Sequence, residues 1–129
     1  MIGSTNVPGL RYSQVTGITD QIERRIAKMN NIVPVIFEEN HWVEADPTGD
    51  LDLWVQTINI TGYMGDAVTE NDRPETFYDA SHYGSTDMDD YIEQCSHVYR
   101  ITTGNGTISA YAYGAEPPTM DIYVDVKGV

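Results

Sequence analysis

The stretch that decides the fold is HVYRITTGNGTISAYAYGAEPPTMDIYVDVK, residues 97–127. Near its middle, Gly104-Asn105-Gly106 is a strong signal for a tight hairpin turn, and it predicts strands over residues 97–103 and 107–114. The last part, residues 120–127, alternates apolar side chains with polar or aromatic ones, which is typical of a strand with one buried face. The apolar positions of this last strand are Met120, Ile122, Val124 and Val126. Consecutive strands joined in this way indicate a mostly antiparallel sheet.

Earlier in the chain, three segments have a strand-like composition: residues 32–38, 41–44 and 51–60. They are rich in β-branched and aromatic residues, and residues 51–60 carry apolar side chains on both faces, as a central strand does. A short helical turn is predicted over residues 87–94. Residues 62–83 are polar and punctuated by glycine, so they predict one long loop, of a length that compact domains rarely keep without a use for it.

One amphipathic helix is predicted over residues 19–30. Asp20 and Glu23 suit a capping box at its start, and Pro34 forces the residue before it into extended geometry. Four apolar residues recur at spacings of four, four and three and so form one stripe, which is made of Ile18, Ile22, Ile26 and Met29. A stripe of this kind normally buries itself on a neighbouring element. We therefore expect the helix to pack on the sheet.

The chain is predicted to form one domain preceded by an arm. At 129 residues it is long enough to bury a core without disulfides, and its single cysteine, Cys95, excludes an intrachain disulfide. Residues 1–16 lack apolar periodicity, so we expect an extended arm that either frays or docks on a neighbouring subunit. Residues 17–129 are expected to form an α+β domain, mostly antiparallel β, arranged as a sandwich or partly open barrel with the N-terminal amphipathic helix packed on the sheet.

Charge is the strongest signal in the composition. Twenty acidic and seven basic residues give a net charge of −13, and only two of the basic residues are lysines. Such a surface repels the phosphates of nucleic acids and anionic lipids, so we expect no direct nucleic-acid binding and no membrane partner. The longest apolar run, residues 32–37, is too short to span a bilayer, and we expect no secretory signal. Three interpretations of the charge stay open: ordinary acidic solubility, adaptation to high salt, and mimicry of nucleic acid.

Two clusters of aspartates are candidate cation sites. Carboxylates at such short spacings supply the oxygen ligands that Ca²⁺ prefers. Neither cluster has the alternating ligands, central glycine and distal glutamate of a calcium loop. We therefore interpret both as turn and capping acids, and predict no metal site. The clusters are Asp46, Asp50 and Asp52, and Asp87, Asp89 and Asp90.

Cys95 and His97 lie two residues apart, so on a strand they would point to the same face. Together with His82 they could form a three-ligand metal site or a Cys–His nucleophile pair. None of the paired-ligand motifs that accompany such sites occurs in the sequence. We interpret the pair as a buried thiol beside a surface imidazole, and we predict no catalytic residue, no cofactor and no enzymatic activity.

If the last two strands pair with each other, their tyrosines form a partly exposed aromatic strip. Tyr111 and Tyr113 share one face, and Tyr123 is predicted to lie outward in the next strand, flanked by Asp121 and Asp125. Such rings either cover the edge of the core or form a contact with a subunit, a partner or a sugar. The candidate interface residues, which also include apolar residues of the arm and of the long loop, are Val7, Leu10, Tyr12, Tyr63, Met64, Phe77, Tyr78, Tyr83, Tyr111, Tyr113 and Tyr123.

The order of these parts (arm, capped helix, long loop, terminal hairpin) resembles the small accessory structural proteins of tailed viruses. The resemblance covers the whole chain in architecture and rests on no specific motif. It implies a non-enzymatic virion component that acts in a ring or lattice as a head–tail connector, tail-completion or capsid-decoration protein. Its partners would be other copies of itself and other virion proteins, and it would reach the virion after synthesis in the host cytoplasm. The Asp-rich, Lys-poor composition would place that host among halophiles.

Two alternatives come from other functional classes. An acidic inhibitor that mimics nucleic acid would need its charge gathered on one face. A small hydrolase or carbohydrate-binding domain would need acids and tyrosines to line a concave site.

Overall fold

The computed structural model describes the backbone of residues 12–129 and the side chains from Asp20 onward. Most of the expected arm, including Val7 and Leu10, lies outside the described residues, as does the side chain of Tyr12. The described part is an α+β fold with two α-helices and seven strands in two sheets. No helix in this part of the chain has the length and apolar character needed to cross a membrane.

All strand pairs are antiparallel, as the sequence predicted. The three-stranded sheet has the order β1-β7-β4 and the four-stranded sheet the order β2-β3-β6-β5. The strands of the first sheet are β1 (Ile32–Phe37), β7 (Ile122–Lys127) and β4 (Glu75–Tyr78). Those of the second are β2 (Val43–Glu44), β3 (Leu53–Asn59), β6 (Thr107–Tyr113) and β5 (Val98–Gly104).

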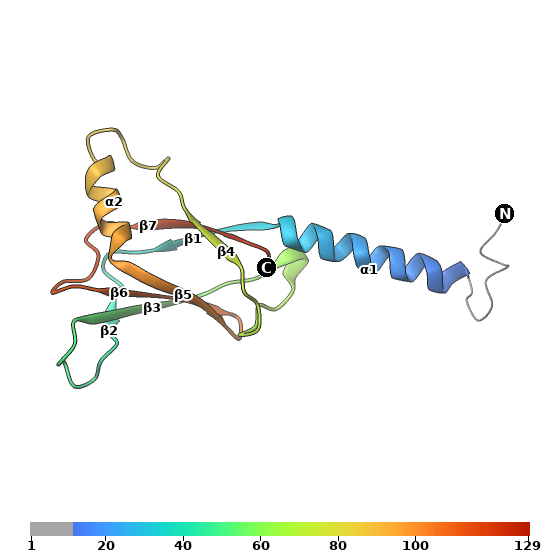
Figure 1. Cartoon of the computed structure of the whole chain (residues 1–129), viewed down its shortest axis with the longest axis horizontal. Coiled ribbons are helices and arrows are strands. Elements are labelled where there is room, and N and C mark those ends of the chain that lie inside the picture. The colour runs from blue at the N-terminus through green and yellow to red at the C-terminus, as the bar shows by residue number, and fades with distance from the viewer. Residues whose placement is uncertain (1–11) are drawn as a thin grey trace.

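The core lies between the two sheets, which face each other in Figure 1. Each central strand contributes alternate residues that are completely or almost completely buried. In β7 these are Ile122, Val124 and Val126, and in β6 they are Ile108, Ala110 and Ala112. The predicted burial of these three β7 residues is confirmed. The small alanines of β6 let the sheets approach closely, because a side chain of one layer must fit the space left by the other.

The predicted β5–β6 hairpin is also confirmed. Gly104 pairs with Thr107, so Asn105 and Gly106 form a two-residue turn. Gly106 has a φ of +73°, a conformation that glycine adopts without strain. Its backbone N–H donates to the Val68 carbonyl at 2.7 Å and its carbonyl accepts from the Ile60 N–H at 3.0 Å. The hairpin tip therefore fixes the loop that follows β3.

Helix α1 (Tyr12–Asn30) differs from the prediction at its start and in its packing. It begins seven residues before Thr19, so residues 12–16 are helical and not part of an extended arm. It projects from the body along the long axis of the molecule instead of packing on a sheet (Figure 1). The reason is the connection: only Asn31 separates α1 from β1, which is too short a link to turn the helix back over the sheet.

The segment predicted as one long loop over residues 62–83 contains two short elements. A 3₁₀ turn, η2, spans Tyr63–Gly65, and β4 pairs with β7 from Glu75 to Tyr78. All four β4 residues are exposed, so this edge strand lacks the alternation by which a strand is recognised in a sequence. Helix α2 (Met88–Ser96) follows the segment, close to the predicted residues 87–94.

Candidate functional site

The apolar stripe of α1 is exposed. Ile22 is 53% exposed, Ile26 54% and Met29 67%. Their spacings of four and three residues place them on one side of the helix. Large contiguous patches of exposed apolar side chains mark interaction surfaces in proteins. We call Ile22, Ile26 and Met29 the α1 stripe.

The opposite side of α1 is fastened to the segment after β3. One guanidinium nitrogen of Arg24, Nη2, donates to both carboxylate oxygens of Asp66, at 2.7 and 2.8 Å. The guanidinium carbon lies 5.5 Å from the centre of the Tyr63 ring. Lys28 reaches Asp72 at 3.4 Å. A hydrogen bond from the Thr69 N–H and the nearby Lys28 ammonium hold the pKa of Asp72 below its usual value. These contacts orient the C-terminal half of α1 and leave the α1 stripe facing away from them.

A second apolar surface is a groove between α2, β4 and β5. Its volume is about 500 Å³, and apolar side chains dominate its lining. Ile92 of α2 is 59% exposed and Tyr78 of β4 is 44% exposed at this groove. We call it the α2 groove and define it by Tyr78, Ala80, Met88, Ile92, Cys95 and Val98. It lies beside α2, between β4 and β5, each of which is an edge strand of its sheet.

Neutral groups form the floor of the α2 groove. Tyr91 is almost completely buried; its hydroxyl lies 3.0 Å from the Asp79 carbonyl and accepts from the Tyr123 N–H at 3.1 Å. Burial raises the pKa of the Tyr91 hydroxyl and that of the Cys95 thiol. A raised thiol pKa disfavours the thiolate, which is the nucleophilic form of cysteine. The groove is therefore suited to hold apolar side chains rather than to carry out nucleophilic chemistry.

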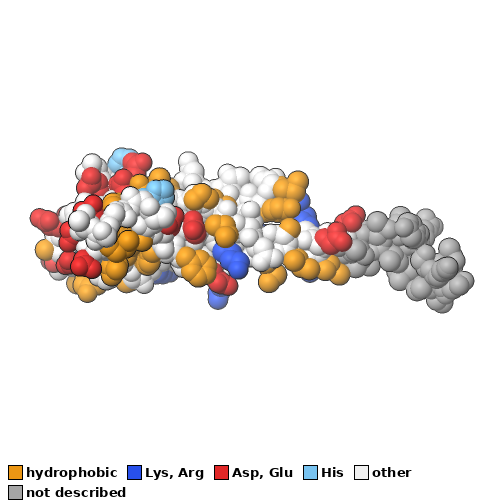
Figure 2. Space-filling model, turned by 90° about the horizontal axis from the view of Figure 1, so that it is seen from above, with side chains coloured by type: hydrophobic (Ala, Val, Ile, Leu, Met, Phe, Trp, Pro, Cys, Tyr) orange, Lys and Arg blue, Asp and Glu red, His pale blue; other side chains and the backbone are white. Residues whose placement is uncertain are grey.

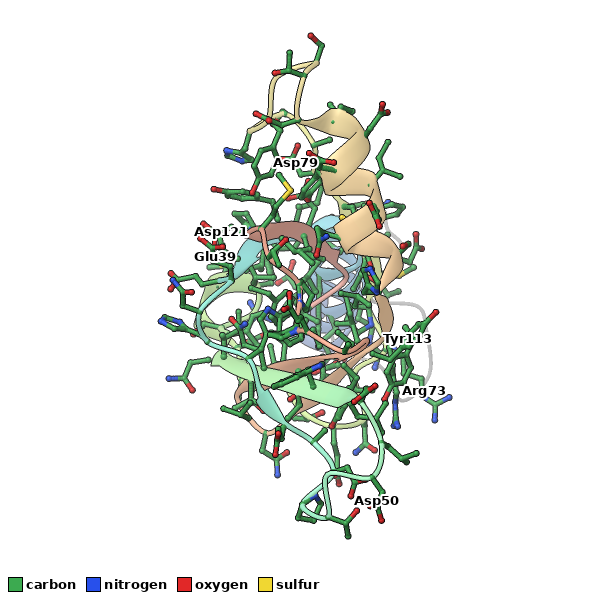
Figure 3. All side chains as sticks on the ribbon, turned by 90° about the vertical axis from the view of Figure 1, so that its left-hand side faces the viewer. Glu39, Asp50, Arg73, Asp79, Tyr113 and Asp121 are labelled. Carbon is green, nitrogen blue, oxygen red and sulfur yellow. The ribbon has the colours of Figure 1, made fainter. Side chains whose placement is uncertain are left out.

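The exposed part of α2 is acidic. Asp89 and Asp90 lie in the first turn of α2, Asp87 is its N-cap residue, and Glu93 follows one turn later. All four are exposed, and no basic residue occurs in α2. In Figure 2 acidic side chains gather at the end of the molecule that carries α2, opposite α1. Figure 3 looks onto this end, where Glu39, Asp50, Asp79 and Asp121 come from four different connections.

The predicted tyrosine strip is divided between the two sheets. Tyr111 and Tyr113 lie on β6, whereas Tyr123 lies on β7, which pairs with β1 and β4 and not with β6. Tyr123 instead stacks on His82, with ring centres 3.8 Å apart. The expected three-tyrosine strip is therefore wrong, because β6 and β7 do not form a hairpin.

Tyr99 of β5 takes the place expected for Tyr123. Its ring centre lies 6.4 Å from that of Tyr111 and 6.5 Å from that of Tyr113. Arg100 lies over the Tyr111 ring at 5.4 Å. We call this group the tyrosine face. Tyr99 could not be assigned to this face from the sequence, because the β5–β6 register shifts between Val98 and Arg100. Simple alternation along β5 therefore places the Tyr99 side chain on the wrong side of the sheet.

The remaining interface candidates occupy different surroundings. Tyr63 lies under Arg24, and Met64 next to it is 75% exposed. Phe77 is 50% exposed on β4, opposite Asp125 of β7. Tyr83 packs against Tyr91 at 4.6 Å between ring centres and donates to the Asp121 carbonyl at 2.6 Å, so its hydroxyl already has a partner within the chain.

Cys95 and His97 do not share a face, contrary to expectation. Cys95 lies on the buried side of α2, and His97 follows the last residue of that helix. The His97 Nδ1 lies 3.0 Å from the Tyr113 carbonyl, and His82 stacks on Tyr123 of the other sheet. The three side chains that could have formed a metal site or nucleophile pair are thus engaged separately.

The aspartate clusters have separate local contacts. Asp46 accepts hydrogen bonds from the Thr48 hydroxyl and N–H and from the Leu51 N–H, which lower the pKa of its carboxyl group. This is the turn role that the sequence predicted for it. Within residues 12–129, no three His, Cys, Asp or Glu side chains gather in an arrangement that could hold a metal ion.

Comparison with protein-family models, with curated proteins and with solved structures gave no match for this chain.

Proposed function

We propose that the chain is a non-enzymatic structural subunit that works in a ring or lattice of its own copies. Its closest functional analogues would be the connector, tail-completion and decoration proteins of tailed viruses. The observation that carries the proposal is the α1 stripe, whose three side chains are each more than half exposed, on a helix that projects from the body (Figure 1). A helix that is held by ion pairs along one side and exposes apolar side chains along the other presents a binding surface to a partner.

Energetics support this assignment. An isolated helix is only marginally stable in water without tertiary contacts, and α1 has just 19 residues. Full burial of an Ile or Met side chain contributes about 1.5–3 kcal/mol. The α1 stripe is more than half exposed, so a partner could still recover roughly half of that amount for each of its three residues. The tyrosine face offers a second surface of the composition that interfaces favour.

We propose that the two sheets form an open sandwich. The two sheets are separate hydrogen-bonded units, and they support the sandwich form of the predicted architecture over the barrel. An open sandwich leaves edge strands such as β1 and β4 available beside α1 and α2. Exposed edges of this kind must be covered or protected in a stable protein, and subunit contacts are one way to do so.

The test is the molar mass of the full chain in solution, measured by sedimentation equilibrium over a range of concentrations. We expect the chain to self-associate and Ile26→Asp to weaken association by at least about tenfold, because a charge would enter a dry contact. Leu51→Asp is the matched control: Leu51 is 61% exposed but lies in the β2–β3 turn, away from α1. A wild-type chain that stays monomeric at its highest soluble concentration, or equal effects of both variants, would overturn the proposal.

A further inference from the structure

We propose that α1 of one copy docks in the α2 groove of the next copy, so that the copies join head to tail. The inference rests on the proposed function and specifies its contact. The α1 stripe would fill the groove, and charges at its margin would pair with acids of α2. An amphipathic helix in an apolar groove is a recurring mode of protein recognition.

The net charge of α1 and that of the rest of the chain differ in sign. Residues 12–30 hold three basic and two acidic residues, a net charge of +1. Residues 31–129 hold three basic and eighteen acidic residues, a net charge of −15. The most basic element of the molecule is therefore also the one that carries the exposed apolar stripe. Arg24 and Lys28 are already paired with acids of their own chain, so within the described residues it is Arg25 that α1 offers to the acidic body of another copy.

Arg25 gives this attraction a specific position. Helical spacing places it beside the α1 stripe, and it is exposed, with no ion pair to any residue in the described part of the chain. Its counterparts are Asp89, three residues before Ile92, and Glu93, three residues before Ser96; Ile92 and Ser96 both line the groove. Docking would bring Arg25 of one copy to the acidic margin of the next.

The groove that α1 occupies must belong to another copy. Figure 1 places α1 and α2 at opposite ends of the molecule. The ion pairs Arg24–Asp66 and Lys28–Asp72 fasten α1 at its own end. A contact between different surfaces of identical copies repeats, and it generates a ring when the rotation closes. This is the geometry that a ring or lattice component needs.

Two other self-contacts fit the charges less well. The tyrosine face carries Arg100 on the Tyr111 ring, which would repel Arg25. A two-fold pair of α1 helices would bring the two Arg25 side chains together near the middle of the contact. Only the α2 groove combines an apolar floor with a uniformly acidic neighbouring helix.

Directed cross-linking tests the contact. In a Cys95→Ser background, Ile26→Cys is mixed with Ile92→Cys on a copy that carries a mass tag. We expect a disulfide between the two copies under mild oxidation. Ile26→Cys mixed with Leu51→Cys is the control and should give little product. Dominant Ile26→Cys homodimers, or no excess of the 26–92 product over the control, would overturn the proposal.

A charge exchange tests it with the native cysteine in place. Arg25→Glu and Glu93→Arg should each weaken association by about tenfold at low salt. The double variant should recover most of the wild-type association, because the ion pair is restored in reverse. Arg25→Glu combined with Asp50→Arg has the same net charge and should not recover it. Equal recovery in both double variants, or none, would contradict the docking.

The two proposals fail in different ways. If the chain associates and Ile26→Asp prevents it, but neither cross-link nor charge exchange succeeds, the subunit function stands and the docking geometry is wrong. If the chain alone never associates, both are wrong, because the contact needs only a second copy.

Discussion

Gln56 is the one polar side chain among the buried residues of the described core. It is 3% exposed and lies on β3, in the four-stranded sheet. Its amide accepts from the Glu38 N–H and donates to the Glu38 carbonyl, both at 2.8 Å. The side chain thus joins the end of β1 to the opposite sheet as a backbone pair would.

We predict that Gln56→Leu lowers the free energy of unfolding by about 2–3 kcal/mol, measured in urea. The substitution leaves a backbone N–H and a carbonyl without their partner, and each partly buried unsatisfied group costs about 1–3 kcal/mol, against which the apolar leucine gains some burial. Thr57→Ala is the control on the same strand, because its hydroxyl bonds to Ser109 in an exposed position. A loss no larger than that of Thr57→Ala would contradict the role of Gln56.

Tyr91 leads to a prediction about alkaline pH. Burial raises the pKa of its hydroxyl, so the folded state keeps the proton that an unfolded tyrosine releases near its ordinary pKa of about 10. The contribution of Tyr91 to the free energy of unfolding is therefore fully present below pH 10. It is lost as the pH rises above 10, by up to about 1.4 kcal/mol per pH unit for each such group. Tyr83 and Tyr78 shift in the same direction, also mainly through burial.

Tyr91→Phe should make this alkaline loss shallower while lowering stability at neutral pH, because the Tyr123 N–H loses its acceptor. Urea unfolding between neutral pH and pH 11 measures both effects. An unchanged slope above pH 10 would show that Tyr91 does not titrate with unfolding.

At the scale of elements, local signals predicted what depends on local structure. The Gly104-Asn105-Gly106 turn and the alternation of β7 predicted the hairpin and the buried face of the last strand correctly, since turn geometry and burial follow from those residues. The start of α1 and the existence of β4 were missed. Residues 12–16 lack a recognisable apolar spacing, and β4 exists only because β7 offers it a hydrogen-bonding edge.

The sequence predicted which residues of the candidate site form an apolar stripe, but not how the site is arranged in space. The apolar stripe on the first helix could be found from its spacing, but its exposure depends on a one-residue link to β1. The α2 groove could not be predicted, because it is made by three elements that are distant in sequence. The assignment of Tyr123 to the tyrosine strip failed for the same reason.

We predict that the body folds without α1. Among the described side chains, residues 20–30 contribute no member of the buried core. Removal of residues 1–30 breaks two ion pairs, the exposed Arg24–Asp66 pair and the partly buried Lys28–Asp72 pair, each worth about 0–1 kcal/mol. The free energy of unfolding should therefore fall by no more than about 2 kcal/mol, with a cooperative transition retained. Loss of the cooperative urea transition would show instead that α1 supports the core.

At the scale of the whole molecule, a net charge of −13 opposes the compact state. We predict that the melting temperature rises from low to molar KCl, because salt screens the repulsion among the acidic residues. The Arg24–Asp66 pair weakens in the same range, but its contribution is smaller than that of the excess acids. A melting temperature that stays constant or falls with KCl concentration would contradict adaptation to high salt.

The central claim is that another copy covers α1, and amide hydrogen exchange tests it most directly. Exchange of residues 22–30 is compared between a dilution at which the chain is monomeric and the associated state, with Ile122, Val124 and Val126 of β7 as the internal reference. We predict that the amides of the helix exchange fast in the monomer and at least tenfold more slowly in the associated state, which corresponds to about 1.4 kcal/mol or more of protection. The exchange of the reference amides should not change. Protection of the helix that is the same in monomer and assembly would contradict the central claim.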